Sequence, residues 1–220
     1  MDSAPLPFPT SFHNHPMIES ALLRALNERI LLWDGAMGTQ IQGAGLPDEA
    51  FILPDTPDTP ERVKIAAERM GGKLLDGCNE LLCLTRPELI YDIHRRYFEA
   101  GSDMVETNTF GTTSIVLAEY DIPELVPEFA RAAGRIAVQA AREASTPDRP
   151  RFAIGALGPG TKLVSLEQTT WDVLVQTYED AFVALLEEGV DGLLLETLQD
   201  LLMVMAGIYA ANRAMATTQR

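Results

Sequence analysis

The chain has 220 residues, and 17 Lys and Arg against 32 Asp and Glu give it a net charge of −15. Hydrophobic residues make up 46% of it, enough to bury a core, so the composition gives no indication of disorder, collagen or coiled coil. The acidic balance argues against nucleic acid and anionic membrane as partners, since both require a positively charged surface. No apolar run reaches the ~18–20 residues needed to span a bilayer. Two cysteines are too few for a disulfide framework, so we expect a cytoplasmic protein.

Residues 1–18 carry several prolines and histidines and are predicted to form a flexible N-terminal arm, followed by one domain over residues 19–220. A short helix is predicted near the start of this domain, from leucines spaced three and four apart. The apolar run at 30–33 ends in Asp and Gly, which is typical of a buried strand that opens into a loop. Residues 47–60 are rich in Pro and Asp and are predicted to be loop, and a short helix is predicted over 61–70.

A well-marked helix is predicted over 87–100. Thr85 and Glu88 have the spacing of a capping box, apolar residues repeat at helical spacing, and Gly101 ends the run. Residues 103–105 follow as a short apolar strand with a polar end. Helix, glycine and short apolar strand in this order are typical of α/β proteins.

The same order of elements returns along the chain. The pattern predicts helices over 124–143, from about 172, and over 201–214, and strands over 152–156 and 193–195. Gly101-Ser102-Asp103 before Glu106-Thr107 corresponds to Gly189-Val190-Asp191 before Glu196-Thr197, a weak internal repeat. Together with the run at 30–33, we count four strand–helix units of all-parallel character, and therefore an α/β fold.

Acidic side chains follow three of the four predicted strands, namely Asp34, Glu106 and Glu196. The carboxyl ends of parallel strands meet at one edge of the sheet, where α/β proteins bind ligands. A carboxylate there can bind an ammonium group or act as a base, and the glycine-flanked backbone after Asp34 can bind a carboxylate. Each residue also has an ordinary interpretation, a turn for Asp34 and a helix cap or rim ion pair for each glutamate. The equivalent places of the two glutamates in the repeat favour a shared function.

Other candidate residues give weaker evidence of a function. Cys78 and Cys83 do not make a zinc site, because a structural zinc needs three or four ligands, so they are interpreted as structural thiols. His94 lies inside the predicted helix, and the other two histidines lie in the arm. The small residues at 155–160 lack the spacing of a phosphate loop and are interpreted as allowing close backbone approach.

Several strings together resemble the homocysteine-binding module of cobalamin-dependent methionine synthases, in the homocysteine S-methyltransferase family. They lie at residues 33–40 (WDGAMGTQ), 79–94 (NELLCLTRPE through IH), 99–110 (EAGSD and ETNTF), 157–159 (LGP) and 195–197 (LET). The resemblance covers residues 28–214. It implies the (βα)8 TIM-barrel family with only about the first four βα units present in this chain. It also implies an enzyme, a methyltransferase that transfers a methyl group to the homocysteine thiolate to form methionine.

The resemblance also implies roles for individual residues. Asp34 and Gly35 would hold the amino and carboxylate ends of homocysteine, and Glu196 would face its ammonium group. Glu106 and Asn108 would line the pocket. Zinc is implied as the cofactor that keeps the sulfur as thiolate, and methylcobalamin on a separate module as the methyl donor.

In that family three cysteines hold the zinc, at positions beyond Arg220, so no metal-binding or catalytic residue is predicted in this chain. We therefore expect a truncated chain that is inactive alone and that needs the missing C-terminal half of the barrel or a completing subunit. One alternative is a non-catalytic half-barrel that binds a small amino acid or a partner subunit. Another is a barrel enzyme that uses Glu106 and Glu196 as acid and base on an unrelated substrate.

Overall fold

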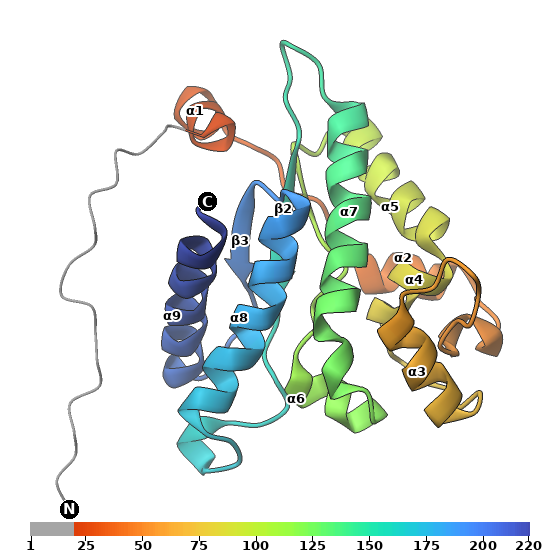
Figure 1. The fold of residues 1–220 in the computed structure, drawn as a ribbon. Coiled ribbons are helices and arrows are strands. Elements are labelled where there is room, and N and C mark those ends of the chain that lie inside the picture. The colour runs from red at the N-terminus through yellow and green to blue at the C-terminus, as the bar shows by residue number, and fades with distance from the viewer. Residues whose placement is uncertain (1–19) are drawn as a thin grey trace, which may run out of the picture.

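The computed structural model describes residues 20–220, so the arm predicted at 1–18 lies outside the described residues. Helices alternate with strands along the chain (Figure 1). The strands are β1 (Met104–Glu106), β2 (Phe152–Leu157) and β3 (Gly192–Leu195). The α-helices are α1 (Ala21–Glu28), α2 (Met37–Gly43), α3 (Glu61–Met70), α4 (Leu82–Thr85), α5 (Pro87–Ala100), α6 (Ser114–Leu117), α7 (Val126–Ala144), α8 (Trp171–Glu188) and α9 (Leu201–Thr218).

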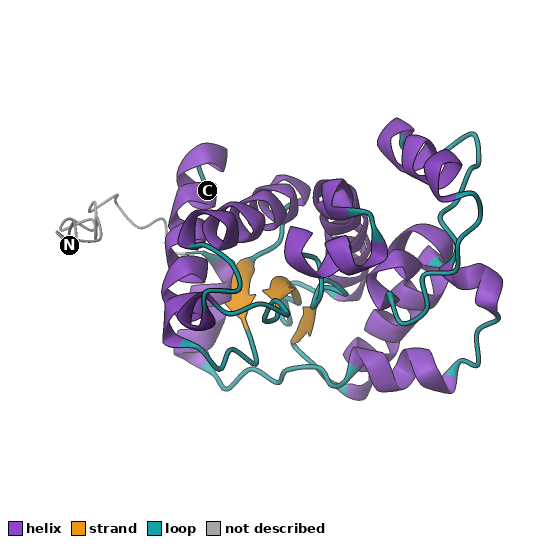
Figure 2. Cartoon of the chain, turned by 90° about the horizontal axis from the view of Figure 1, so that it is seen from below, coloured by secondary structure: helices purple, strands orange, loops and turns teal. Residues whose placement is uncertain are grey.

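The three strands form one parallel sheet in the order β1-β2-β3, with Val105 paired to Ala153 and Gly155 to Leu193. Parallel neighbours need a crossover, which α7 and α8 supply. The strands predicted at 103–105, 152–156 and 193–195 are confirmed, as are the helices around them. Seen from below, the long helices border the sheet on one side (Figure 2). Within residues 20–220, no helix has the length and apolar character that crossing a membrane requires.

The two faces of the sheet pack against different partners, because side chains alternate along a strand. Val105 and Ala153 join the main core, which includes the buried faces of α7 and α8. Met104 and Phe152 belong to a separate cluster with Ala25 of α1. Helix α1 therefore covers the face of the sheet that carries Met104 and Phe152, near the amino ends of the strands. It lies at the upper end of the view in Figure 1.

Glycines in the segment 155–160 allow close packing, as the sequence predicts. A Cβ on Gly155 would lie 3.0 Å from Cδ1 of Leu185, so α8 can rest directly on β2. A Cβ on Gly158 would lie 2.6 Å from the ring of Phe110, so the loop after β2 touches the loop after β1.

The strand predicted at 30–33 does not form as a strand. Leu32 lies beside the start of β1, and its carbonyl oxygen accepts from the N–H groups of Asp103 (2.7 Å) and Met104 (3.1 Å). Its own N–H donates to the side chain of Asp103, at 3.0 Å from Oδ2. Further along, the N–H of Glu106 donates to the side chain of Asp34 at 3.1 Å in place of a backbone carbonyl. The ladder therefore does not continue, and the described residues contain three strands instead of four.

The internal repeat corresponds to a repeated connection between strands. The N–H of Ala153 donates to Oδ2 of Asp191 (2.9 Å), and the N–H of Asp191 donates to the Ala153 carbonyl (2.8 Å). Asp103 makes the same two-way contact with the segment at 30–33. Each aspartate follows a helix that ends at a glycine, Gly101 with φ 117° and Gly189 with φ 94°, in the left-handed region that glycine favours.

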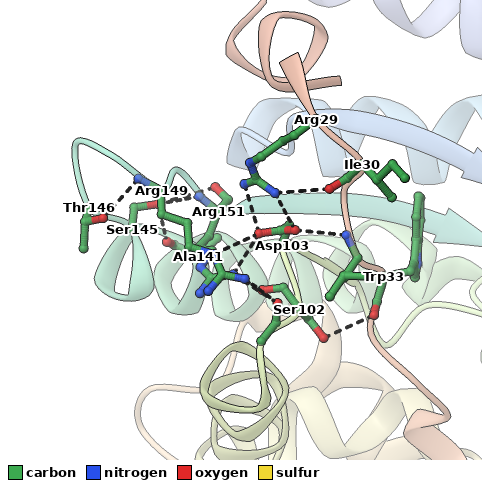
Figure 3. A network of polar contacts seen from close by, with 12 residues as sticks. Arg29, Ile30, Trp33, Ser102, Asp103, Ala141, Ser145, Thr146, Arg149 and Arg151 are labelled. Atoms are coloured by element: carbon green, nitrogen blue, oxygen red, sulfur yellow. Dashed lines mark hydrogen bonds and ion pairs between the residues drawn. The ribbon is translucent and has the colours of Figure 1, made fainter. Parts of the chain in front are cut away.

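Asp103 also lies at the centre of a network of arginines (Figure 3). Arg29 donates to it through both terminal nitrogens (2.7 and 3.0 Å), Arg149 through Nε (3.2 Å) and Arg151 through Nη1 (3.0 Å). Burial favours a higher pKa, but the hydrogen bonds from Arg29, from a backbone N–H and from Arg149 outweigh it and lower the pKa of Asp103 to about 2. The network ties the segment that leads into Asp34 to the starts of β1 and β2.

Helix α5 begins at Pro87, as predicted, but the predicted capping box does not form. The residue before the helix is Arg86, which makes no capping bond through its side chain. The Thr85 hydroxyl instead donates to the carbonyl oxygen of Ala50, at 2.7 Å. Ala50 belongs to a short 3-10 helix, Asp48–Phe51, within a segment that the sequence predicts to be loop.

Candidate functional site

Three carboxyl groups converge at the carboxyl edge of the sheet. Glu106 is the last residue of β1, Glu196 directly follows β3, and Asp34 follows the extended segment beside β1. Side chains two residues apart share a face of a strand, so Glu106 lies on the face of Met104 and Glu196 on that of Leu194. Met104 belongs to the cluster around Ala25, and Leu194 packs against that cluster. The two glutamates therefore lie on the same face of the sheet, the one that α1 covers.

Asp34 is held by the backbone of the neighbouring strand. Its Oδ2 accepts the N–H of Glu106 at 3.1 Å. Burial raises the pKa of Asp34 to about 7, and the negative charges of Glu106 and Glu196 add to the rise, while the hydrogen bond from the Glu106 N–H opposes it. Since Asp34 senses the charge of both glutamates, the three groups form one electrostatic site.

Glu196 is half-buried and interacts directly with Glu106. Burial raises the pKa of Glu196 to about 7, helped by the charge of Glu106 and by a hydrogen bond between the two carboxyl groups. A hydrogen bond from Thr197 acts in the opposite direction. Two carboxyl groups can share a hydrogen bond when one of them carries a proton. The edge can therefore hold a proton near neutral pH and can bind a small cation, such as an ammonium group, when that proton leaves.

The remaining predicted site residues have different surroundings. Gly35 is exposed and directly follows Asp34, beside the ring of Tyr97. Asn108 is buried, and its amide nitrogen donates to the Asn79 carbonyl (2.9 Å) and lies 3.6 Å from Sγ of Cys83. The structure thus brings Asp34, Gly35 and the glutamates to one edge, while the amide of Asn108 ties the loop after β1 to the segment before α4.

Three further residues shape this edge, and the sequence does not identify them as part of the site. Thr107 accepts the Ala156 N–H at 3.1 Å, and the Thr109 hydroxyl donates to the Ala156 carbonyl at 2.5 Å, so both fasten the end of β1 to β2. Tyr97 donates to the carbonyl oxygen of Ala36 at 3.2 Å, and no sequence pattern singles it out.

The two cysteines differ from these carboxyl groups because their side chains do not ionise near neutral pH. Cys78 and Cys83 are buried free thiols, and burial raises the pKa of each to about 12, so both stay protonated at neutral pH. Among residues 20–220, no three His, Cys, Asp or Glu side chains are arranged to hold a metal ion. A zinc ion needs thiolate, imidazole or carboxylate ligands in such a set, so the described residues do not fit one.

The fold and this edge define an α/β protein with a cluster of carboxyl groups at the carboxyl ends of parallel strands. Residues 31–219 match the homocysteine S-methyltransferase family, and the chain belongs to that family. The resemblance seen in the sequence is thereby confirmed.

Known relatives agree with this assignment. The chain is 39% identical over 204 residues to the methionine synthase of Mycobacterium tuberculosis, covering 93% of this chain and 15% of the relative. It is also 39% identical over 207 residues to the methionine synthase of Mycobacterium leprae, covering 94% of this chain and again 15% of the relative. The chain thus spans a small part of the length of these relatives.

Solved structures share the fold. The homocysteine methyltransferase MmuM of Escherichia coli, in its oxidized form, superposes with a TM-score of 0.60 at 22% identity, covering 90% of this chain and 62% of that one. The metallated form gives 0.58 at 20% identity, with 89% and 62% covered. These neighbours place the fold in the TIM-barrel family.

Proposed function

We propose that this chain is the homocysteine-binding part of a methyltransferase that transfers a methyl group to the homocysteine thiolate and forms methionine. The observation that carries the proposal is the convergence of Asp34, Glu106 and Glu196 at one edge of a sheet in a homocysteine S-methyltransferase fold. An amino acid substrate carries one ammonium and one carboxylate group. Carboxyl groups with a raised pKa can bind the ammonium by giving up their shared proton.

Each residue has a role in this proposal. Glu196 and Asp34 bind the ammonium group of homocysteine, and Oδ2 of Asp34 is held in place by the Glu106 N–H. The backbone beside Gly35 binds the substrate carboxylate. Glu106 lines the pocket beside Glu196, and Asn108 borders it through the loop that its amide holds in place.

The next question is which part of the enzyme holds zinc and the methyl donor. Zinc in this chemistry keeps a thiol as thiolate at neutral pH, but the described part of the chain offers no fitting ligand set. Without a metal, the substrate thiol keeps a pKa of ~8.5 and stays mostly protonated near pH 7. We therefore propose that zinc ligands and a methylcobalamin module lie elsewhere in the assembled enzyme, and that this chain alone does not transfer methyl groups.

The domain over residues 19–220 is proposed to be about the first four βα units of a barrel. Strand β3 pairs with β2 alone among the described strands, and its residues are only half-buried. Helix α9 next to it exposes Leu201, Ile208 and Met215, which are spaced seven apart along one face of the helix. This face suits the C-terminal half of the barrel or a completing subunit, because an open strand edge and an apolar stripe favour association.

The same apolar stripe also fits the alternative, a non-catalytic half-barrel that binds a small amino acid or a partner subunit. Turnover separates the two. We propose the cytoplasm as the location on the basis of the two free buried thiols, which a reducing compartment preserves.

The proposal is tested by homocysteine binding to the 220-residue chain, measured by titration calorimetry, and by turnover of a chimera. In the chimera, the chain is followed by the rest of the methionine synthase of Mycobacterium tuberculosis. We expect binding by the chain alone and zinc-dependent methyl transfer by the chimera only. Glu196→Gln should weaken binding, whereas Glu187→Gln, an exposed residue paired with Arg131, should not. Binding without turnover in the chimera would favour the non-catalytic alternative.

A further inference from the structure

The loop that carries Asp34 is attached to the next βα unit mainly through side chains. The Asp34 loop, residues 34–36, follows the segment at 30–33, whose strand ladder ends at Leu32. The Ser102 hydroxyl donates to the Trp33 carbonyl at 3.2 Å, and Asp34 accepts the Glu106 N–H at 3.1 Å. Beyond Asp34, the Tyr97 hydroxyl donates to the carbonyl oxygen of Ala36 at 3.2 Å. The part of the loop between Asp34 and α2 thus depends on a side chain of α5.

Tyr97 also fills the space beside Gly35. A Cβ on Gly35 would lie 3.1 Å from Oη of Tyr97, 3.2 Å from its Cε1 and 3.4 Å from its Cζ. Gly35 is not among the glycines with positive φ, so its backbone conformation does not require glycine. The tyrosine ring leaves little room for a larger residue, because a Cβ could be added only if the ring moved slightly away. The ring therefore supports the backbone at Gly35 while the hydroxyl holds Ala36 directly after it.

We propose that Tyr97 is a positioning residue for the Asp34 loop, fixing the directions of the Asp34 carboxyl group and the Gly35 backbone for an amino acid substrate. This inference rests on the proposed function, because it assigns homocysteine to that loop. A zwitterionic ligand must meet both groups at once, so a loop held in one conformation binds it more tightly than a loop that must be ordered on binding. Tyr97 itself need not touch the substrate.

A tyrosine on the same helix provides a matched control. Tyr91 of α5 donates its hydroxyl to the carboxylate of Glu143 on α7, an exposed contact that involves no residue of the Asp34 loop. Tyr97→Phe and Tyr91→Phe each remove one hydroxyl hydrogen bond from α5. A purely structural role for Tyr97 therefore predicts the same behaviour for both variants.

The test compares these variants by amide hydrogen exchange and by homocysteine titration. We expect Tyr97→Phe to speed exchange at residues 34–38 and to weaken homocysteine binding about fivefold, the range of one lost hydrogen bond. The urea midpoint of unfolding should match that of Tyr91→Phe, which should leave both exchange and binding unchanged. Unchanged exchange at 34–38 in Tyr97→Phe would overturn the proposal.

A second set of variants tests the contact with Gly35. Gly35→Ala should weaken binding, because the new Cβ presses on the ring. In a Tyr97→Leu background, which lacks the ring, Gly35→Ala should weaken homocysteine binding little further. The effects of the two substitutions on binding should therefore be non-additive. Additive effects would contradict the role of the ring. If the parent chain does not bind homocysteine while exchange still depends on Tyr97, the proposed function fails and the positioning of the loop by Tyr97 stands.

Discussion

The backbone N–H of Glu106 donates to Oδ2 of Asp34 at 3.1 Å, so one carboxyl group of the site is attached to the strand that carries another. This bond lies where a parallel ladder would continue if the segment at 30–33 were a strand. Asp34 therefore serves two purposes that can be separated by substitution. Its oxygen satisfies a backbone donor at the end of β1, and its charge is available to a ligand.

Asp34→Asn and Asp34→Ala should separate these purposes. Asn keeps an oxygen acceptor for the Glu106 N–H but loses the charge, so it should weaken homocysteine binding about tenfold with little loss of stability. Ala also leaves the N–H without its partner, which costs about 1 kcal/mol of unfolding free energy. Titration calorimetry and urea unfolding measure the two effects. Equal stability of the two variants would show that the hydrogen bond contributes nothing to the fold.

Ligand binding should depend on pH in a definite direction. With the pKa of Asp34 and of Glu196 near 7, both carboxyl groups are largely protonated at pH 6 and more ionised at pH 7.5. The ionised fraction of a group with a pKa near 7 rises about eightfold between these pH values, so binding of an ammonium group should strengthen by about that factor. Homoserine is a suitable probe because its side chain does not titrate. Glu196→Gln should reduce the slope, and a flat profile for the parent chain would refute the shared-proton description of the site.

The same groups should act in the opposite direction on stability without ligand. Their pKa in the folded state exceeds the ordinary values of 3.8 and 4.5, so the folded chain binds more protons than the unfolded chain between about pH 4 and pH 7. Their contribution to the free energy of unfolding therefore falls as the pH rises through that window. The variant Asp34→Asn, which cannot titrate, should lack its share of this fall in urea unfolding followed from pH 4 to pH 7.

His94 should make the chain sensitive to acid. It is fully buried in α5, both ring nitrogens lack a hydrogen-bond partner in the described structure, and burial lowers its pKa to about 4. The unfolded chain binds a proton near pH 6.5, so stability is lost as the pH falls from about 6.5 to about 4, by up to ~3 kcal/mol.

His94→Leu replaces the imidazole with an apolar side chain that needs no partner. We expect it to be at least as stable as the parent chain at pH 7, and the difference in its favour should grow toward pH 4. Urea unfolding at several pH values measures this difference directly, so the opposing effect of the carboxyl groups cancels. The same pH dependence in both proteins would exclude His94 as its source.

The predictable parts of the fold are those that a local pattern encodes. Gly101 and Gly189 end helices where the sequence predicts, because a left-handed residue after a helix favours glycine. Glu106 and Glu196 reach one edge because parallel strands place their carboxyl ends together. These two facts were sufficient to predict from the sequence that the two glutamates lie at one edge of the sheet.

The wrong predictions concern atoms that find a distant partner. The segment at 30–33 has the composition of a strand, but the side chain of Asp34 accepts the Glu106 N–H that a ladder would pair with a backbone carbonyl. Thr85 has the spacing of a capping residue, but its hydroxyl donates to the carbonyl oxygen of Ala50 instead. The contact of Tyr97 could not be predicted, because it joins α5 to a loop 61 residues earlier in the chain. Such pairings depend on the packed structure, and no local pattern carries them.

Thr197 is the clearest case of strain at the site. Its φ is 58°, a left-handed conformation that a β-branched residue rarely adopts, and it directly follows Glu196. A conformation of this kind costs roughly 1–3 kcal/mol and persists where the surroundings enforce it. Thr197 also gives Glu196 a hydrogen bond, which lowers the pKa of that carboxyl group. The strained residue thus favours the ionised form of a carboxyl group that we assign to the ammonium of homocysteine.

Thr197→Gly should therefore raise stability and weaken binding at the same time. Glycine relieves the strain, so the free energy of unfolding should rise by about 1 kcal/mol. The lost hydroxyl should raise the pKa of Glu196 further and move the midpoint of the binding profile to higher pH. Thr197→Ser keeps the hydroxyl and should keep the profile. Glu167→Gly, at another left-handed position with φ 56° in the loop before α8, should stabilise the chain without affecting binding. If Thr197→Gly bound homocysteine as well as the parent chain at every pH, the hydroxyl would have no part in the site.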